Sequence, residues 1–503
     1  MSSNTLYIPP HAPPYATRLS NELLGLSIEG DRFEDWTGPL GQPNTFTHQA
    51  LKNISDRTAD SQDKYRITDG VRTARVTLAH PPSENTPYPE PATSGVHIGP
   101  DYFALARNLP VGTKLTIGIN LRDQDEEETV AQAALLYDTF HGSRKAELNH
   151  VQLELVTIGN EATLARIPKP DLYEVPLFHR VGPPGWSPFA YVSHTIALAH
   201  RVSAVFHNNV KFQVASITGF FKDEEKWVPR TILGSGLMQD PIFRQISVYS
   251  SHMYFGDLKA TSGTLMNKAF IRQMIRHWAE YRPVIEAAGL EFRIGETNSL
   301  ARGGVSGISN AAEAVIWLVD YALHAACLGL ARLHFHHRVG QSYNWFDPVP
   351  ITGISGGTRA DAHDTPAIHA PYYGALVLAD AIGKEEDTRI VELACILPHV
   401  AAYGIYTQHK GLVRAVFINS ETYLDPNAAR PVTEIELQGL PDSVVGSKVK
   451  RMYCPLTTST SSLTWAGQSY ETADAVATGT VEETRLQSPT LRIAASEVVL
   501  LSL

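Results

Sequence analysis

The chain has 503 residues, of which 43% are hydrophobic and 19% are charged. This composition is typical of globular proteins, and the length exceeds what one hydrophobic core usually organises, so we expect two domains. The formal net charge of −10, from 42 Lys and Arg against 52 Asp and Glu, argues against a protein that mainly binds nucleic acid or another polyanion. No segment approaches the ~20 consecutive apolar residues that a membrane helix needs.

The cysteines and the N-terminal segment bear on the cellular compartment. Cys327, Cys395 and Cys454 lie far apart without C-x-x-C spacing, so they predict buried thiols instead of a zinc site or a disulfide framework. Residues 1–15 are rich in proline and polar residues and lack the features of a secretory signal. We expect an extracellular protein whose signal is absent from this sequence, with a cytoplasmic protein as the alternative.

Short hydrophobic runs alternate with helical patterns up to about residue 380. Helices are predicted over 128–140, 265–288 and 310–328, the last with Asn310 and Glu313 spaced as a capping box. Eight runs have strand length, and several are nearly all apolar: 23–28, 74–78, 114–119, 152–158, 211–217, 246–249, 291–294 and 332–335. Such runs are typical of strands buried on both faces of a parallel sheet. The alternation predicts a (β/α)8 TIM barrel over residues 20–375.

After about residue 385 the pattern changes to short β-type runs, at 412–418, 433–437, 448–453, 490–493 and 497–501. Turn residues such as Asp425-Pro426-Asn427 separate them. This spacing predicts an antiparallel β-sandwich of residues 376–503, which we expect residues 1–19 to complete.

Two glutamates stand at the ends of buried strands, each close behind a glycine. Ile158-Gly159-Asn160-Glu161 ends one apolar run, and Ile294-Gly295-Glu296 ends another 135 residues later. The carboxyl ends of barrel strands form one face, so both carboxylates are expected in one cleft. Paired carboxylates are the equipment of glycoside hydrolysis, in which one protonates the leaving oxygen and the other attacks the sugar carbon. The alternative is that each glutamate merely ends a strand at a solvated loop.

These motifs resemble those of glycoside hydrolase family 79, the β-glucuronidase and heparanase group of the retaining (β/α)8-barrel glycosidases. In that clan an Asn-Glu pair ends strand 4 and carries the acid/base, and a second Glu ends strand 7 and is the nucleophile. Further segments are similar to the family: 96–103, 250–254, 295–299 and 402–406. The resemblance covers nearly the whole chain, from about residue 23 to the last predicted strand.

The resemblance implies a role for several residues. Glu161 would be the general acid/base and Glu296 the nucleophile. Asn160 would hydrogen-bond the sugar 2-hydroxyl, and Tyr254 would donate a hydrogen bond to Glu296 and hold its orientation. The other implied substrate contacts are Glu29, Asn298, and Ser342 and Tyr343 in the loop that would receive the substrate's carboxylate.

Some segments depart from the family or allow another interpretation. Residues 162–170 resemble an insertion after the Asn-Glu pair, and 54–61 lack the glycines that the family has there. His334, His336 and His337 suggest a metal cluster at first sight. Strand alternation puts His337 on the opposite face and no carboxylate completes the set, so we expect no metal and no cofactor.

The sequence therefore predicts an exo-acting retaining β-glucuronidase that removes terminal β-linked glucuronic acid, with or without a 4-O-methyl group. No cluster of Lys and Arg borders either glutamate motif, which argues against a cleft for a long sulfated chain. The expected partner is a glycan that contains glucuronic acid, with no nucleic acid and no membrane. The alternatives are a heparanase-like endo-β-glucuronidase, another β-glycosidase of the clan, and a catalytically silent carbohydrate-binding relative.

Overall fold

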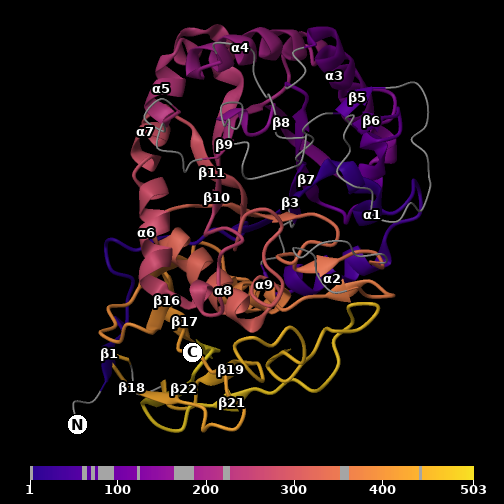
Figure 1. The fold of residues 1–503 in the computed structure, drawn as a ribbon. Helices are drawn as coiled ribbons and strands as arrows, with labels where there is room; N and C mark the ends of the chain where they lie inside the picture. The colour runs from indigo at the N-terminus through magenta and orange to yellow at the C-terminus, as the bar shows by residue number, and fades with distance from the viewer. Residues whose placement is uncertain are drawn as a thin grey trace.

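A computed structural model of the chain describes residues 4–58, 65–69, 74–76, 96–121, 125–163, 186–218, 227–351, 362–440 and 444–503. In Figure 1 the indigo to pink part of the chain surrounds a barrel, and the orange and yellow C-terminal strands gather beside one side of it.

Eight parallel strands close into the barrel. In chain order they are β3 (Leu24–Ile28), β4 (Tyr65–Asp69), β7 (Thr113–Ile119), β8 (Gln152–Ile158), β9 (Phe212–Thr218), β10 (Ile246–Tyr254), β11 (Glu291–Asn298) and β12 (Leu333–His337). The ring closes where β12 pairs in parallel with β3 and Leu333 lies opposite Leu24. The predicted (β/α)8 barrel is thus confirmed, and the carboxyl ends of all eight strands lie on one rim.

The second barrel strand differs from the prediction. The predicted run 74–78 contains β5 (Ala74–Val76), which pairs with β6 (Val96–Ile98) in a separate two-stranded sheet. The barrel instead uses β4, whose sequence Tyr-Arg-Ile-Thr-Asp is mostly polar. A search for nearly continuous apolar runs therefore passes over it.

Helices α3 (Glu126–Phe140), α4 (Pro188–Val205) and α5 (Pro229–Gly234) follow β7, β8 and β9, as Figure 1 shows around the upper half of the barrel. The predicted helix 265–288 is two helices, α6 (Lys268–Ala279) and α7 (Arg282–Ala287). Pro283 stands in the first turn of α7, where its missing N–H is tolerated, and it cannot continue α6. Helices α1 (Phe33–Thr37) and α2 (Thr45–Ser55) follow β3.

Helix α8 (Ala312–Cys327) is buried on all sides from Ala312 to Ala326. It packs against α9 (Pro371–Ile382) so closely that a Cβ at Gly374 would lie 2.9 Å from Cδ2 of Leu318. The predicted domain boundary at residue 376 falls inside α9. Because α9 packs on a barrel helix, we propose that the boundary lies just after α9.

The predicted capping box at the start of α8 is wrong. The N-cap residue is Ala311, which has no side-chain cap, and Asn310 Oδ1 accepts a hydrogen bond from the Gly307 N–H at 2.6 Å. Glu313 Oε2 instead accepts from the backbone N–H groups of Gly263, at 3.0 Å, and Leu265, at 3.4 Å. Glu313 therefore fixes a distant segment that follows β10.

The C-terminal residues form two sheets that pack as a sandwich, as predicted. The larger is ordered β2 (Thr17–Arg18), β15 (Arg389–Glu392), β16 (Val400–Thr407), β17 (Gly411–Asn419), β23 (Glu497–Ser502), β19 (Lys448–Tyr453) and β20 (Thr464–Trp465), with β21 (Thr484–Arg485) also on β19. The smaller contains β1 (Thr5–Tyr7), β18 (Val432–Gln438) and β22 (Thr490–Ala494). Their facing side chains, such as Phe417 and Leu437, share one core. Each sheet thus includes one N-terminal strand.

One buried guanidinium ties the barrel to the sandwich. Arg272 of α6 donates to Asp320 of α8, to Glu392 of β15 and to the Tyr403 hydroxyl of β16, with its Nη2 atom 2.7 Å from an oxygen of each. None of the three cysteines forms a disulfide, and Cys454 alone among them is fully buried.

We predict that Glu313→Gln makes the protein more stable at alkaline pH. Burial raises the pKa of Glu313 from its usual 4.5 to about 7. The hydrogen bonds that Glu313 accepts from the two backbone N–H groups lower this pKa, but their effect is smaller. The contribution of such a carboxyl to the free energy of unfolding is complete at pH values below its unfolded-state pKa. This contribution is lost as the pH rises through the higher folded-state pKa. The Gln amide keeps an acceptor oxygen but cannot ionise.

The expected result is a gain in the free energy of unfolding that grows by roughly 1–3 kcal/mol between pH 5 and pH 8. Urea unfolding at both pH values measures it. Gln at the exposed Glu280 is the matched control and should show no such growth. A gain that is equal at both pH values would contradict the prediction.

Candidate active site

Glu161 follows β8 in a backbone conformation that the surrounding strands enforce. Its φ is +50°, which is uncommon for a residue other than glycine. Its N–H donates to the Ser216 carbonyl oxygen of β9 at 2.7 Å. Gly159 has φ +79°, and a Cβ there would lie 2.5 Å from Leu121 Cδ2, so only glycine fits. Strained backbone of this kind is concentrated at functional sites.

Glu296 lies within β11, close against β10. A Cβ at the preceding Gly295 would come within 2.2 Å of Ser250 Oγ, so glycine permits the close approach of the two strands. The register between them shifts just before His252, which brings His252 opposite Glu296. Two residues further along β10, the Tyr254 hydroxyl donates to Glu296 Oε1 at 2.7 Å.

The structure brings Glu161 and Glu296 together around one imidazole. His252 Nδ1 lies 3.1 Å from Glu161 Oε1 and 3.5 Å from Glu296 Oε2. The three ligand atoms lie within 4.8 Å of one another, and the side chains are only 7%, 4% and 3% exposed for Glu161, Glu296 and His252. The two carboxylates are therefore close enough to act together on one glycosidic bond.

Two tyrosines border the glutamates with stacked rings, whose centroids lie 6.2 Å apart. Burial and the charge of Glu296 raise the pKa of Tyr254 well above its usual value. Burial and the charges of Glu296 and Glu29 do the same to the pKa of Tyr343. Both phenols therefore stay protonated at neutral pH and can donate hydrogen bonds.

Glu29 lies at the carboxyl end of β3, on the same rim. Its Oε2 is 3.2 Å from His336 Nε2, and Nδ1 of that imidazole is 3.0 Å from Ser27 Oγ. His334 and His337 have backbone partners: Nδ1 of His334 is 3.3 Å from the Ile294 oxygen, and His337 Nε2 accepts from the Trp345 N–H at 2.9 Å. The polar face of β12 thus positions Glu29 through His336.

The two asparagines expected at the substrate differ in environment. The buried Asn160 Nδ2 has no hydrogen-bond partner within the described ranges, so it offers a donor beside Glu161. Asn298 Nδ2 donates to the carbonyl oxygens of His336, at 2.9 Å, and Tyr343, at 3.2 Å. The amide hydrogens of Asn298 are thereby engaged, and this side chain holds the loop after β12. Ser342 is buried in that loop.

Sequence reasoning missed His252 as a site residue. The signal was present, because His252 and Tyr254 are two positions apart on a strand and so share one face. Within the described part of the chain, two sets of side chains have atoms placed to hold a metal ion. One is Glu161, His252 and Glu296, and the other is Asp347, His363 and His369. The predicted insertion at 162–170 lies outside the described residues from residue 164 onward.

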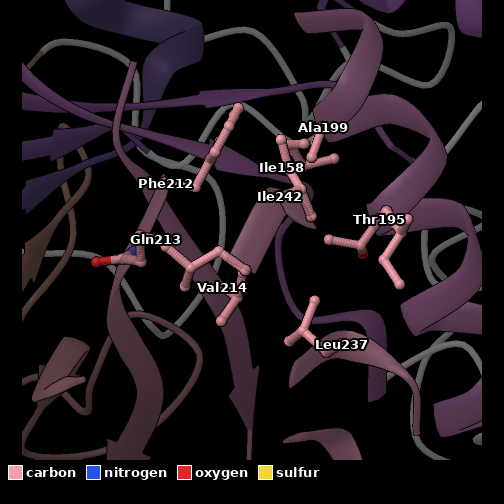
Figure 2. A pocket seen from close by; sticks show the side chains of 10 residues that line it. Ile158, Thr195, Ala199, Phe212, Gln213, Val214, Leu237 and Ile242 are labelled. Atoms are coloured by element: carbon pink, nitrogen blue, oxygen red, sulfur yellow. The ribbon is translucent and has the colours of Figure 1, made fainter. Parts of the chain in front are cut away.

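A gap beside the barrel strands is not a second site. Figure 2 shows apolar side chains around it, with the Gln213 amide pointing away from them. The gap is too narrow to hold a water molecule. Its lining comes from β8, α4, β9 and the segment before β10, and includes Ile158, Thr195, Ala199, Phe212, Val214, Leu237 and Ile242. It is a packing defect beneath α4.

Two buried carboxylates at the carboxyl ends of barrel strands, held by tyrosine and histidine, define the class of glycoside hydrolases. Residues 402–500 match the model of the glycosyl hydrolase family 79 C-terminal beta domain. The chain is 25% identical over 502 residues to a β-glucuronidase of Neurospora crassa, covering 88% of this chain and 83% of that one. It is 26% identical over 484 residues to a β-glucuronidase of Aspergillus niger, covering 89% and 82%. Residues 402–500 thus match a family 79 domain, and most of the chain is similar to β-glucuronidases.

Solved structures share the fold over nearly the whole chain. A 4-O-α-L-rhamnosyl-β-D-glucuronidase from Fusarium oxysporum has a TM-score of 0.76 at 23% identity, covering 99% of this chain and 100% of that one. A family 51 α-L-arabinofuranosidase from Bifidobacterium longum has a TM-score of 0.61 at 11% identity, covering 99% of both. The barrel and its β-sandwich are therefore common to glycosidases of different specificity.

We predict that Tyr254→Phe lowers kcat by about 10- to 100-fold. The variant loses a hydrogen bond to a charged carboxylate, which is worth about 1.5–3 kcal/mol. Steady-state kinetics on an aryl glycoside measures the effect. Phe at Tyr249, on the same strand, is the matched control, because that buried hydroxyl has no partner among the described residues. Equal losses in the two variants would contradict the assignment.

Proposed function

We propose that the protein is an exo-acting retaining β-glucuronidase that removes terminal β-linked glucuronic acid from a glycan. The observation that carries the proposal is the buried pair Glu161 and Glu296, whose oxygens lie within 4.8 Å around His252. The names of the two curated relatives support glucuronic acid as the sugar.

In the proposed reaction Glu296 attacks the anomeric carbon while Glu161 protonates the glycosidic oxygen. A covalent glycosyl ester on Glu296 results, and Glu161 then deprotonates the water that hydrolyses it. Tyr254 orients Glu296 and stabilises its charge, and His252 positions both carboxylates through Nδ1. Asn160 donates to the sugar 2-hydroxyl, a contact that strengthens in the transition state.

The substrate's carboxylate would bind at the loop after β12. Tyr343 is a protonated donor there, and Ser342 adds a hydroxyl. The charge of Arg338 lies close enough to lower the pKa of Tyr343, against the stronger effects of burial and the two glutamates. A neutral sugar would offer these donors no carboxylate, which is a source of selectivity.

An extracellular location is part of the proposal. No helix in the described ranges is long and apolar enough to cross a membrane. The one N-glycosylation triplet, at Asn53, offers no support for secretion. That amide is buried and donates to the Ala475 oxygen at 2.7 Å.

We predict that Glu296→Gln lowers hydrolysis of 4-nitrophenyl β-D-glucuronide by at least about 10⁴-fold, because the nucleophile is lost. Glu161→Ala should retain formation of the covalent ester from this activated substrate and recover turnover when azide replaces the water. A 2-fluoro glucuronide should label Glu296, as peptide mass spectrometry would show. A label on another residue would overturn the mechanism.

A substrate panel tests the specificity. The wild type should cleave the glucuronide at least about 100-fold faster than the glucoside, since the glucoside lacks the carboxylate that the donors of Tyr343 and Ser342 would bind. A 4-O-rhamnosyl glucuronide belongs in the panel because of the Fusarium oxysporum structure. Preference for the glucoside would indicate another β-glycosidase, and binding without turnover would indicate a carbohydrate-binding protein.

A further inference from the structure

Three side chains from the segment after β12 converge on one point away from the carboxylate pair. Asp347 lies in β13 (Phe346–Asp347), and its Oδ2 is 3.3 Å from His363 Nε2 and 2.9 Å from His369 Nε2. The three atoms lie within 4.8 Å of one another. The Asp347 side chain is fully buried, and those of His363 and His369 are 17% and 11% exposed.

The backbone sets these positions through its own hydrogen bonds. Strand β13 pairs with β14 (Ala367–Ile368), with Asp347 opposite Ala367. His363 and Ile351 exchange two backbone hydrogen bonds, at 2.9 and 3.1 Å, and the His369 N–H donates to the Trp345 oxygen at 2.9 Å. Each of the three side chains therefore starts from a fixed backbone position, and the cluster is preorganised for a ligand.

The hydrogen bonds of His363 leave a lone pair in the cluster. Its Nδ1 faces the Thr365 carbonyl oxygen and must donate to it, so in the neutral ring Nε2 carries no hydrogen. That lone pair faces Asp347 Oδ2. Two acceptors in contact need a cation or a proton between them. A metal-bound histidine commonly donates its other N–H to a backbone carbonyl in this way.

The same carboxylate oxygen also faces His369 Nε2, so one central cation would satisfy all three atoms. Two imidazoles and a carboxylate form a donor set suited to zinc and neighbouring divalent metals.

We propose that Asp347, His363 and His369 bind one divalent transition-metal ion, with zinc as the best-fitting metal. Ligand atoms around a tetrahedral zinc lie about 3.3 Å apart, given bonds of about 2.0 Å. The two observed distances of 3.3 and 2.9 Å are close to this value. The partly exposed histidines give the ion an entry path.

The bound ion would stabilise the loop that the proposed substrate carboxylate contacts. The second oxygen of Asp347, Oδ1, accepts from the Gly340 N–H and from Asn344 Nδ2, both at 2.8 Å. Asn344 also bonds the N–H and the carbonyl oxygen of Arg338, at 3.1 and 2.6 Å. Asp347 thus joins the metal cluster to both ends of a loop that contains Tyr343. The metal site itself does not depend on the proposed activity.

The test uses the full chain without an affinity tag, stripped with chelator and dialysed against zinc. Elemental analysis should find one zinc ion per chain. His363→Gln and His369→Gln should each weaken zinc binding by more than about 100-fold in a chelator competition, since even outer partners of metal ligands are worth about 10- to 100-fold. His200→Gln is the matched control, because His200 Nε2 pairs with the lone carboxylate of Asp240 at 2.7 Å.

Two further measurements separate loss of metal from loss of fold. Zinc should raise the thermal midpoint of the stripped wild type by a few degrees and leave those of both variants unchanged. His252→Gln should keep the zinc, which excludes binding at the carboxylate pair. Zinc bound equally by wild type and both cluster variants would overturn the proposal. So would a wild type that retains no zinc, in which case a proton holds the cluster together.

Discussion

Two carboxylates that share one imidazole nitrogen in a buried site are the constraint on which the rest of this molecule depends. Water is largely excluded around Glu161 and Glu296, so the repulsion between two negative charges within 4.8 Å is strong. The Tyr254 hydroxyl donates to Glu296, whereas His252 Nδ1 lies nearer to Glu161 than to Glu296. The two carboxylates therefore have different partners, which fits the different roles proposed for them.

The barrel maintains the pair at this distance. Each glutamate depends on a local irregularity: Glu161 on its bond to Ser216, and Glu296 on the register shift that sets His252 opposite it. Strands with such irregularities keep their geometry only if the elements that pack around them are rigid. The all-round burial of α8 and the Arg272 network, which ties α6 and α8 to the sandwich, provide it. The β-sandwich therefore contributes to the site by bracing the barrel.

The sequence predicts the structural features that depend on a local pattern of residues. It does not predict the features that depend on contacts between distant segments. Seven of the eight barrel strands follow from apolar runs, whereas β4 is mostly polar and was missed. Glu161 and Glu296 are predictable because each stands just behind a glycine at a strand end. Glu313 has the spacing of a capping-box residue, but its side chain accepts hydrogen bonds from Gly263 and Leu265 in another segment. A rule based on spacing along the chain cannot identify such partners. Asp347, His363 and His369 escape prediction for the same reason.

An acidic protein that binds an acidic sugar must gather positively charged groups or hydrogen-bond donors at its binding site. The formal charge of −10 is distributed over the chain, and Glu29 and Glu296 even add negative charge beside Tyr343. That charge raises the pKa of Tyr343 and so ensures that the phenol remains a donor. Arg338 supplies a cation close by, and Asn344 fixes its backbone through Asp347. The acidic surroundings thus keep the Tyr343 phenol protonated, as its proposed role in selecting a uronic acid requires, and the hydrogen bonds of Asp347 hold its loop in position.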